Sequence, residues 1–275
     1  MMMYKKVAVA MSVYKSDIAE NIKLSIDSIL GQSYSNLDVF IEVDGYISED
    51  CVELLNLYSK LDNVFVNFNS ENRGLATRLN SIIDKIIEIG EYTYIARMDA
   101  DDIAFTERIT EQVNFLDENS EVSVVGTDLI EISDSGEEIF HKKMYYDHHS
   151  ISIAIIRKCP FSHPTVMFRE NVFSKSYIRY KPELMNTQDY YLWVDLLSAG
   201  HIFANIPRPL LYYRVNDDFH SRRGWNKAMN DLRSRVYAFK KLDVLSFSNV
   251  LHTLMLFLLR ISPSFVKSAA YKFLR

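Results

Sequence analysis

The chain has 275 residues, 48% of them apolar and 24% charged, a composition that excludes a disordered protein and indicates one large domain or one domain with an appendage. Its two cysteines, Cys51 and Cys159, lie far apart and form no Cys-x-x-Cys pair, which argues against a disulfide framework and a zinc site and favours a reducing compartment. The formal net charge is −5, and we expect no nucleic-acid partner.

Strands and helices alternate along the first hundred residues. Apolar, β-prone runs predict strands over residues 5–14, 37–44, 63–68 and 92–98, and amphipathic stretches predict helices over residues 17–31, 48–60 and 74–90. The first helix has Asp17 as its expected N-cap and Gly31 as its end. This alternation is typical of βαβ units, so we expect an α/β fold with a mostly parallel sheet and helices on both faces.

The rest of the chain is less regular. We expect helices over residues 105–118, 188–200 and 226–242, strands over residues 122–132 and 209–215, a mixed region over residues 140–185, and two tail helices broken near Pro263. No apolar stretch reaches the roughly 18 to 20 residues needed to span a bilayer.

The charge is divided unevenly along the chain. Residues 222–275 carry eleven Lys or Arg and two Asp, a net of +9, whereas residues 1–221 carry twenty Lys or Arg and thirty-four Asp or Glu, a net of −14. We therefore divide the chain into a main domain, residues 1–222, and a basic helical extension, residues 223–275. We expect the extension to lie on an anionic membrane surface, and the alternative is a set of helices packed on the main domain or on a second subunit of a homodimer.

Three aspartates, Asp99, Asp101 and Asp102, follow the predicted strand 92–98. Strand alternation would point Asp99 and Asp101 to the same side, where two carboxylates can hold Mn²⁺ or Mg²⁺ together with phosphate oxygens of a substrate. Asp44 also ends a predicted strand, so it is expected on the same rim of the sheet. The alternative is an acidic loop in which Asp102 interacts with the N-terminus of the next helix.

The first strand-to-helix turn, "MSVYKSD" over residues 11–17, contains Ser12 and Tyr14 but no glycine. Dinucleotide-binding and P-loop folds use glycine-rich turns at this place. The turn therefore argues against NAD, FAD and ATP hydrolysis, and bound phosphates would need a metal for part of their neutralisation.

Several segments, in this order along the chain, resemble the family 2 glycosyltransferases, which are inverting enzymes of the GT-A fold. The matching pieces include "NRGLATRLNSII", "CPFSHPTVMFRE", "QDYYLWVDLLSAGHIFANIPRPLLYYRV" and, as the most specific, "YIARMDADDIAFTERITEQVNFLDENSEVSVVGTDL". The resemblance runs through most of residues 5–222, which makes this segment the expected catalytic domain.

The resemblance implies a role for each matching carboxylate. Asp99 and Asp101 match the D-x-D that holds Mn²⁺ or Mg²⁺ on the diphosphate of the donor. Asp44 matches the acid that recognises the nucleotide base, although the family often has two adjacent acids where this chain has Val43 and Asp44. Asp189 matches the general base and follows Gln188 where the family usually has Glu, a change that removes a like charge and would tend to lower the pKa of the base.

Other expected nucleotide-sugar contacts are Ser12, Tyr14, Arg73 and Arg78, together with Arg214 and His220 in a loop that closes over the diphosphate. For Arg73 and Arg78 the alternative is a solvated position on the surface. For the loop with Arg214 and His220 it is a disordered basic loop, and for Asp189 it is an ordinary acid at a helix N-terminus. Gly224 stands where processive synthases of the family need Arg in Q-x-x-R-W, so transfer of one sugar is expected.

The resemblance implies transfer of a hexose, Glc or Gal, from a UDP-sugar to a lipid-linked saccharide on polyprenyl diphosphate, with a β-linkage, in O-antigen or capsule synthesis. The expected location is cytoplasmic, peripheral on the cytoplasmic face of the plasma membrane. Two alternatives stay open. A sugar nucleotidyltransferase should show a glycine-rich, basic N-terminal loop, and a nucleotide-sugar-binding or polysaccharide-binding protein should show no turnover.

Overall fold

The computed structural model describes residues 5–184, 186–215 and 225–262. A nine-stranded sheet forms the centre of this part, with the order β3-β2-β1-β4-β8-β6-β9-β5 and with β7 paired on β6. The strands are β1 (Val7–Tyr14), β2 (Leu37–Asp44), β3 (Val64–Asn69), β4 (Tyr94–Asp99), β5 (Ile103–Ala104), β6 (Val122–Ile132), β7 (Glu138–Lys142), β8 (Met167–Arg169) and β9 (Ile202–Arg214). The helices are α1 (Ala19–Leu30), α2 (Glu49–Tyr58), α3 (Leu75–Ile89), α4 (Arg108–Glu118), α5 (His148–Ala154), η1 (His163–Thr165), α6 (Asn171–Ser176), α7 (Gln188–Ser198), α8 (Trp225–Leu242) and α9 (Phe247–Ile261).

The first four long strands are parallel, as the strand–helix alternation predicts. β1 pairs in parallel with both β2 and β4, and β2 pairs in parallel with β3. β8 runs antiparallel between β4 and β6, whereas β6 and β9 are parallel. The sheet is therefore mixed, with its parallel half at the N-terminal end of the chain.

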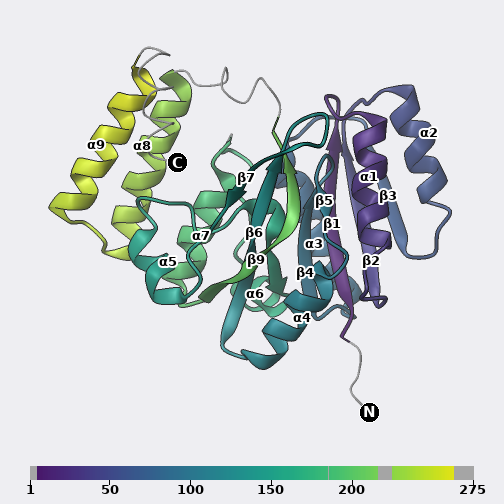
Figure 1. Cartoon of the computed structure of the whole chain (residues 1–275), viewed down its shortest axis with the longest axis horizontal. Helices are drawn as coiled ribbons and strands as arrows, with labels where there is room; N and C mark the ends of the chain where they lie inside the picture. The colour runs from purple at the N-terminus through teal and green to yellow at the C-terminus, as the bar shows by residue number, and fades with distance from the viewer. Residues whose placement is uncertain (1–4, 185, 216–224, 263–275) are drawn as a thin grey trace.

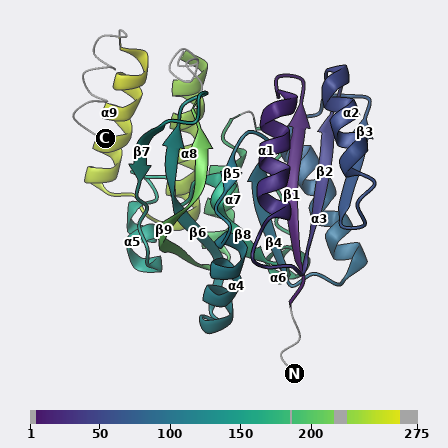
Figure 2. The ribbon, with the colours of Figure 1, turned by 45° about the vertical axis from the view of Figure 1, so that its right-hand side comes forward.

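Helices cover both faces of the sheet, which confirms the expected layer arrangement (Figures 1 and 2). One face is packed by α1, α2 and α4, whose apolar side chains join those of β1 and β2 in one core cluster. The other face is packed by α3, α6 and α7 around the buried Trp193. All eight residues of β2 are buried because the strand is covered on both sides.

Three local predictions need correction or refinement. Asp17 is not the N-cap of α1, since Ile18 holds that position and the Asp17 carboxylate accepts the backbone N–H of Tyr14 at 2.9 Å. The final strand of the sheet, β9, begins seven residues before the predicted 209–215. The mixed region 140–185 contains short elements, of which β8 has three residues and α6 has six.

Gly126 in β6 marks a close approach between the sheet and the segment that leads into η1. A Cβ at this position would lie 2.3 Å from Asn205 Oδ1 and 2.6 Å from Phe161 Cδ1. Both neighbours are buried, and Asn205 Nδ2 donates to the carbonyls of Tyr145 and Pro160, at 2.7 and 3.1 Å. Glycine is therefore required at position 126, because the Asn205 side chain beside it joins two loops through its hydrogen bonds.

Gly126→Ala is expected to lower the free energy of unfolding by about 1–3 kcal/mol, because an overpacked core forces its neighbours off their rotamers. Urea denaturation of the purified variant measures this change. Gly31→Ala is the matched control, because its new Cβ would meet only the carbonyl oxygen of Asp27, at 3.1 Å. Equal stability losses for the two variants would contradict the proposed close approach.

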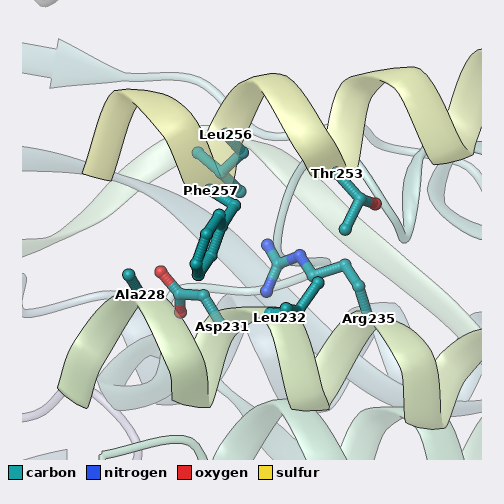
Figure 3. Close-up of a pocket in the computed structure, with 7 residues that line it drawn as sticks. All are labelled: Ala228, Asp231, Leu232, Arg235, Thr253, Leu256 and Phe257. Atoms are coloured by element: carbon teal, nitrogen blue, oxygen red, sulfur yellow. The ribbon is translucent and has the colours of Figure 1, made fainter. Parts of the chain in front are cut away.

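The C-terminal helices pack in sequence on the rest of the fold. α8 lies against α7, where Ala238 joins Ile155, Tyr190 and Val194 in a third core cluster. α9 lies against α8 with Arg260 and Asp231 joined by a 2.7 Å ion pair, and a small gap between the helices is lined by Arg235, Thr253 and Phe257 (Figure 3). For α8, the structure therefore agrees with the alternative given above, in which helices of the extension pack on the main domain.

The outer face of α9 is apolar and exposed. Its six large exposed side chains are Phe247, Leu251, Leu254, Met255, Leu258 and Ile261, which we call the α9 stripe. Figures 1 and 2 show α9 as the outermost element on its side of the molecule. Among the described residues, no helix is both long enough and apolar enough to cross a bilayer.

Candidate active site

The parallel strands end at one rim, and this rim carries the predicted carboxylates. In register, Ser12 of β1 lies opposite Asp99 of β4, and Tyr14 lies opposite Asp44 of β2. Ser12 is half-buried and Tyr14 is exposed. Four residues expected at the nucleotide sugar thus stand on adjacent strands, because parallel pairing brings carboxyl ends together.

Asp99 is paired with an arginine that lies beneath the rim. Arg97 Nη2 donates to Asp99 Oδ1, and the Arg97 side chain is only 3% exposed. Among the described residues no group accepts from Arg97 Nε or Nη1. The two residues are two positions apart in one strand, so their side chains share a face.

Asp101 and Asp17 concentrate negative charge in front of Asp99. Burial, followed by the charge of Asp99, raises the pKa of Asp101 to about 6. Burial, with smaller contributions from Asp101 and Asp99, raises the pKa of Asp17 to about 7. Burial and like charge therefore favour the protonated forms of Asp101 and Asp17 unless a cation compensates.

Asp102 has a different environment from its two neighbours. It is fully buried, and its Oδ1 accepts the backbone N–H of Arg214 at 3.0 Å. Burial, with the charges of Asp99 and Asp101, raises its pKa well above the ordinary value. Asp102 therefore joins the loop to β9, and its charge also acts on Arg108, the first residue of α4.

Arg214 holds the aspartate loop in place. Its side chain donates to the carbonyls of Asp101, Ser133 and Asp134, at 3.1, 3.2 and 2.9 Å. Arg214 is 6% exposed, so the described geometry gives it a bracing role at the edge of the candidate site.

Asp44 is saturated by hydrogen bonds from the chain itself. Its carboxylate accepts the N–H groups of Arg73 and Gly74 at 2.8 and 2.9 Å, and Nε of Arg78 at 2.7 Å. Arg78 is buried, so it is not the solvated arginine of the alternative, whereas Arg73 is exposed and pairs with Glu71. Asp44 and Arg78 therefore shape the loop that begins α3, and any contact of Asp44 with a base would share its oxygens with these donors.

Asp189 lies in the first turn of α7, and its Oδ1 accepts the backbone N–H of Tyr190 at 2.8 Å. Burial raises its pKa, the charge of Asp99 adds to the shift, and Lys142 opposes it. The net direction is upward, so the expected lowering through Gln188 is outweighed by burial. A half-buried carboxylate with a raised pKa beside Asp99 has the properties of a general base.

The rim fits a divalent metal ion held jointly with a substrate. Asp101 and Asp99 offer hard oxygen ligands in a desolvated, negatively charged place. No group of three or more acidic, His or Cys side chains within residues 5–184, 186–215 and 225–262 forms a complete metal site. The fit is therefore to an ion that takes its remaining ligands from phosphate oxygens and water.

Two residues of this rim were missed by sequence reasoning, and one predicted residue has no described position. Asp17 is predicted above as a helix cap, and Arg97 falls within the predicted strand 92–98 with no role assigned to it. A charged residue inside an otherwise apolar strand, on the same face as Asp99, was the available signal for Arg97. His220 lies outside the described residues.

Comparison with known proteins places this geometry in a family. The family model of Glycosyl transferase family 2 matches residues 8–179. The chain is 33% identical over 216 residues to the O-antigen biosynthesis glycosyltransferase WbnJ of Escherichia coli, covering 77% of this chain and 80% of that protein. It is 28% identical over 229 residues to the amylovoran biosynthesis glycosyltransferase AmsE of Erwinia amylovora, covering 82% and 83%.

Solved structures share the fold. TarS of S. aureus in complex with UDP-GlcNAc has a TM-score of 0.70 at 16% identity, over 93% of this chain and 72% of that one. The mannosyltransferase PcManGT of Pyrobaculum calidifontis, in complex with GDP-Man and Mn²⁺, has a TM-score of 0.61 at 12% identity, over 98% and 76%. The mixed sheet and its helices are thus a GT-A fold, the fold of a class of glycosyltransferases. The chain belongs to glycosyltransferase family 2.

Proposed function

We propose that this protein is a metal-dependent inverting hexosyltransferase that moves one sugar, Glc or Gal, from a UDP-sugar to a lipid-linked saccharide in the assembly of a bacterial surface polysaccharide. The observation that carries the proposal is the rim where the charge of Asp99 raises the pKa of both Asp101 and the candidate base Asp189. The O-antigen and amylovoran relatives support the polysaccharide context. TarS, solved with UDP-GlcNAc, supports a nucleotide-sugar donor.

In this mechanism Asp189 takes the proton of the acceptor hydroxyl as the hydroxyl attacks the anomeric carbon, and a β-linkage results from inversion. Its Oδ1 is held by the Tyr190 N–H, so Oδ2 is the oxygen that accepts the proton. The raised pKa of Asp189 makes it a stronger base than an exposed aspartate.

Asp101, with Asp99, would hold Mn²⁺ or Mg²⁺, which when bound neutralises charge on the departing diphosphate. Arg97 fixes the carboxylate of Asp99, and Arg214 fixes the backbone of Asp101. Ser12, Tyr14, Asp44, Arg73 and Arg78 are proposed to shape the nucleotide pocket, directly or through the loop that they hold. The boundary proposed between catalytic domain and extension, near residue 222, lies in a segment outside the described residues.

Release of UDP from UDP-, GDP- and dTDP-sugars tests the proposal, measured with Mn²⁺, Mg²⁺ or EDTA and with or without a GlcNAc-diphosphate-lipid analogue. Metal-dependent release from one donor, stimulated by the acceptor, is expected. Tight metal-dependent UDP binding without turnover on any acceptor would favour the nucleotide-sugar-binding alternative. Formation of a sugar nucleotide from a sugar phosphate would favour the nucleotidyltransferase alternative.

We further propose that the protein is cytoplasmic and peripheral on the plasma membrane, with the α9 stripe as its contact surface. Arg233, Lys240 and Lys241 are exposed on the adjacent α8, so basic groups accompany the apolar side chains. An apolar helix face flanked by cations suits an anionic lipid surface. The second-subunit alternative would cover the same stripe in a homodimer.

Leu254→Ser combined with Leu258→Ser is expected to weaken binding to anionic vesicles at least roughly tenfold, because each buried leucine contributes about 1.5–3 kcal/mol. Both side chains are at least half exposed, so the fold should tolerate the change. Leu57→Ser, at a similarly exposed leucine on α2, is the matched control in the same vesicle sedimentation assay. Unchanged vesicle binding with loss of a dimer in light scattering would assign the stripe to the homodimer instead.

A further inference from the structure

Two lysines on neighbouring loops lie beside the candidate base and are not needed for the chemistry described above. Lys142 is the last residue of β7, opposite Leu129 of β6. Lys158 follows α5, and its Nζ donates to the carbonyl of Lys143. The contact joins the segment after β7 to the segment after α5. β7 lies on the side of the sheet that faces α8 and α9 (Figures 1 and 2).

The loops that carry these lysines are held firmly. Asn205 Nδ2 donates to Tyr145 O and Pro160 O and so joins the segment after β7 to the segment after α5. Lys158 Nζ also lies 5.1 Å from the centre of the Tyr145 ring. The backbone that carries both lysines is therefore held by the hydrogen bonds of Asn205, and the Lys158 ammonium also lies over the Tyr145 ring.

Neither lysine has a carboxylate partner. The charge of Asp128 reaches Lys158, but its oxygens accept the N–H of Met144 at 2.8 Å and the hydroxyl of Tyr146 at 3.2 Å, and His141 lies at 3.3 Å. Within the part of the chain that the structure describes, no acidic side chain lies within ion-pair distance of the Lys142 or Lys158 amine. Lys158 has donated one of its three N–H groups, which leaves two for a ligand.

The pair is within electrostatic reach of the candidate base. Burial raises the pKa of Cys159 to about 12, the charge of Asp189 adds to this, and Lys142 opposes it. Burial, followed by the like charge of Lys142, lowers the pKa of Lys158. Cys159 packs on the core cluster that contains Tyr190, the residue after Asp189, and the Tyr190 hydroxyl donates to the carbonyl of Ile155 at 3.0 Å. The segment that carries Lys158 therefore lies against the first turn of α7, and the two cations repel each other until an anion binds.

We propose that Lys142 and Lys158 form a phosphate-binding subsite that receives the diphosphate of the acceptor while its terminal sugar lies at Asp189. The proposal rests on the function proposed above, because it assigns the acceptor's anion to a place in that same site. A diphosphate is joined directly to the reducing end of a lipid-linked saccharide, so it follows the sugar along the rim toward α9. Two ammonium groups without counter-ions match its charge. The lipid that follows would continue toward the α9 stripe.

The test compares two acceptors in neutral detergent, a GlcNAc-diphosphate-alkyl compound and the alkyl glycoside of GlcNAc that lacks the diphosphate. Lys142→Ala and Lys158→Ala are each expected to raise KM for the first acceptor roughly tenfold, and the double variant more, since each loses one charge-assisted contact. KM for the second acceptor, and KM for the donor, should not change. Lys142→Arg should keep most of the affinity, and Lys60→Ala, an exposed lysine at the far edge of the sheet, is the matched control.

Equal KM changes for both acceptors, or no change for either, would overturn the subsite. An effect that appears only on anionic vesicles and not in neutral detergent would also overturn it, because the lysines would then serve lipid headgroups. If the wild-type protein transfers to neither acceptor, the proposed function fails separately, and calorimetry with inorganic pyrophosphate in the absence of metal still decides the subsite. Weaker pyrophosphate binding by the double variant supports it, and unchanged binding refutes it.

Discussion

Asp189→Asn is expected to reduce sugar transfer by a factor on the order of 10² or more while UDP binding in Mn²⁺ is retained. Asparagine keeps the shape of the side chain and can still accept the Tyr190 N–H through Oδ1, but it cannot take a proton from the acceptor hydroxyl. Single-turnover transfer and UDP titration, measured on the same preparation, separate the two effects. Asp84→Asn, an exposed acid on α3, is the matched control.

The pH dependence provides a second measurement on the same residue. Burial and the charge of Asp99 raise the pKa of Asp189, so the acidic limb of the kcat profile should lie above the range of an ordinary aspartate. The change of stability with pH has the opposite sign to that of a salt-bridged acid, because folding favours the protonated form of Asp189. The contribution of Asp189 to stability is present below its unfolded pKa and is lost as pH rises through its folded pKa. Asp189→Asn should therefore unfold at an equal or higher temperature at pH 8, and retained transfer in a stable variant would refute the base assignment.

Asp101→Ala is expected to abolish metal-dependent binding of UDP. The carboxylate lies in a place where burial and Asp99 already raise its pKa to about 6, so its main source of stabilisation as an anion would be a cation. Calorimetry with UDP in Mn²⁺ and in EDTA measures the difference. The variant should bind UDP equally weakly in both conditions.

Asp62→Ala, at an exposed acid beyond α2, controls for a general loss of negative charge. Removal of Asp101 also relieves the repulsion on Asp17, whose pKa is raised to about 7 by burial and, to a smaller extent, by the charge of Asp101. The variant should therefore be at least as stable as the wild type at neutral pH. If it binds UDP normally in Mn²⁺, the metal belongs elsewhere or is not required.

The regular part of the fold was predictable because its local signals agree. The strand predicted over residues 37–44 is β2 to the residue, because most of its residues are apolar and β-prone and it is bounded by the turn residues Asn36 and Gly45. The end of α3 at Gly90 was also predictable, because its φ of 71° is one that glycine adopts at no cost. The region 140–185 was not, because elements as short as β8 exist only through their pairing with β4 and β6.

By itself, the sequence determined the α/β class, the family and the place of Asp99 and Asp101 at a strand end, because periodicity and ordered motifs are local properties of the chain. The tertiary structure alone decided which side chains face one another. In the structure Arg78 pairs with Asp44, Arg214 holds the aspartate loop, and the charge of Lys142 acts on Asp189. Such pairings depend on strand order and helix packing across tens of residues, and no spacing in the chain encodes them.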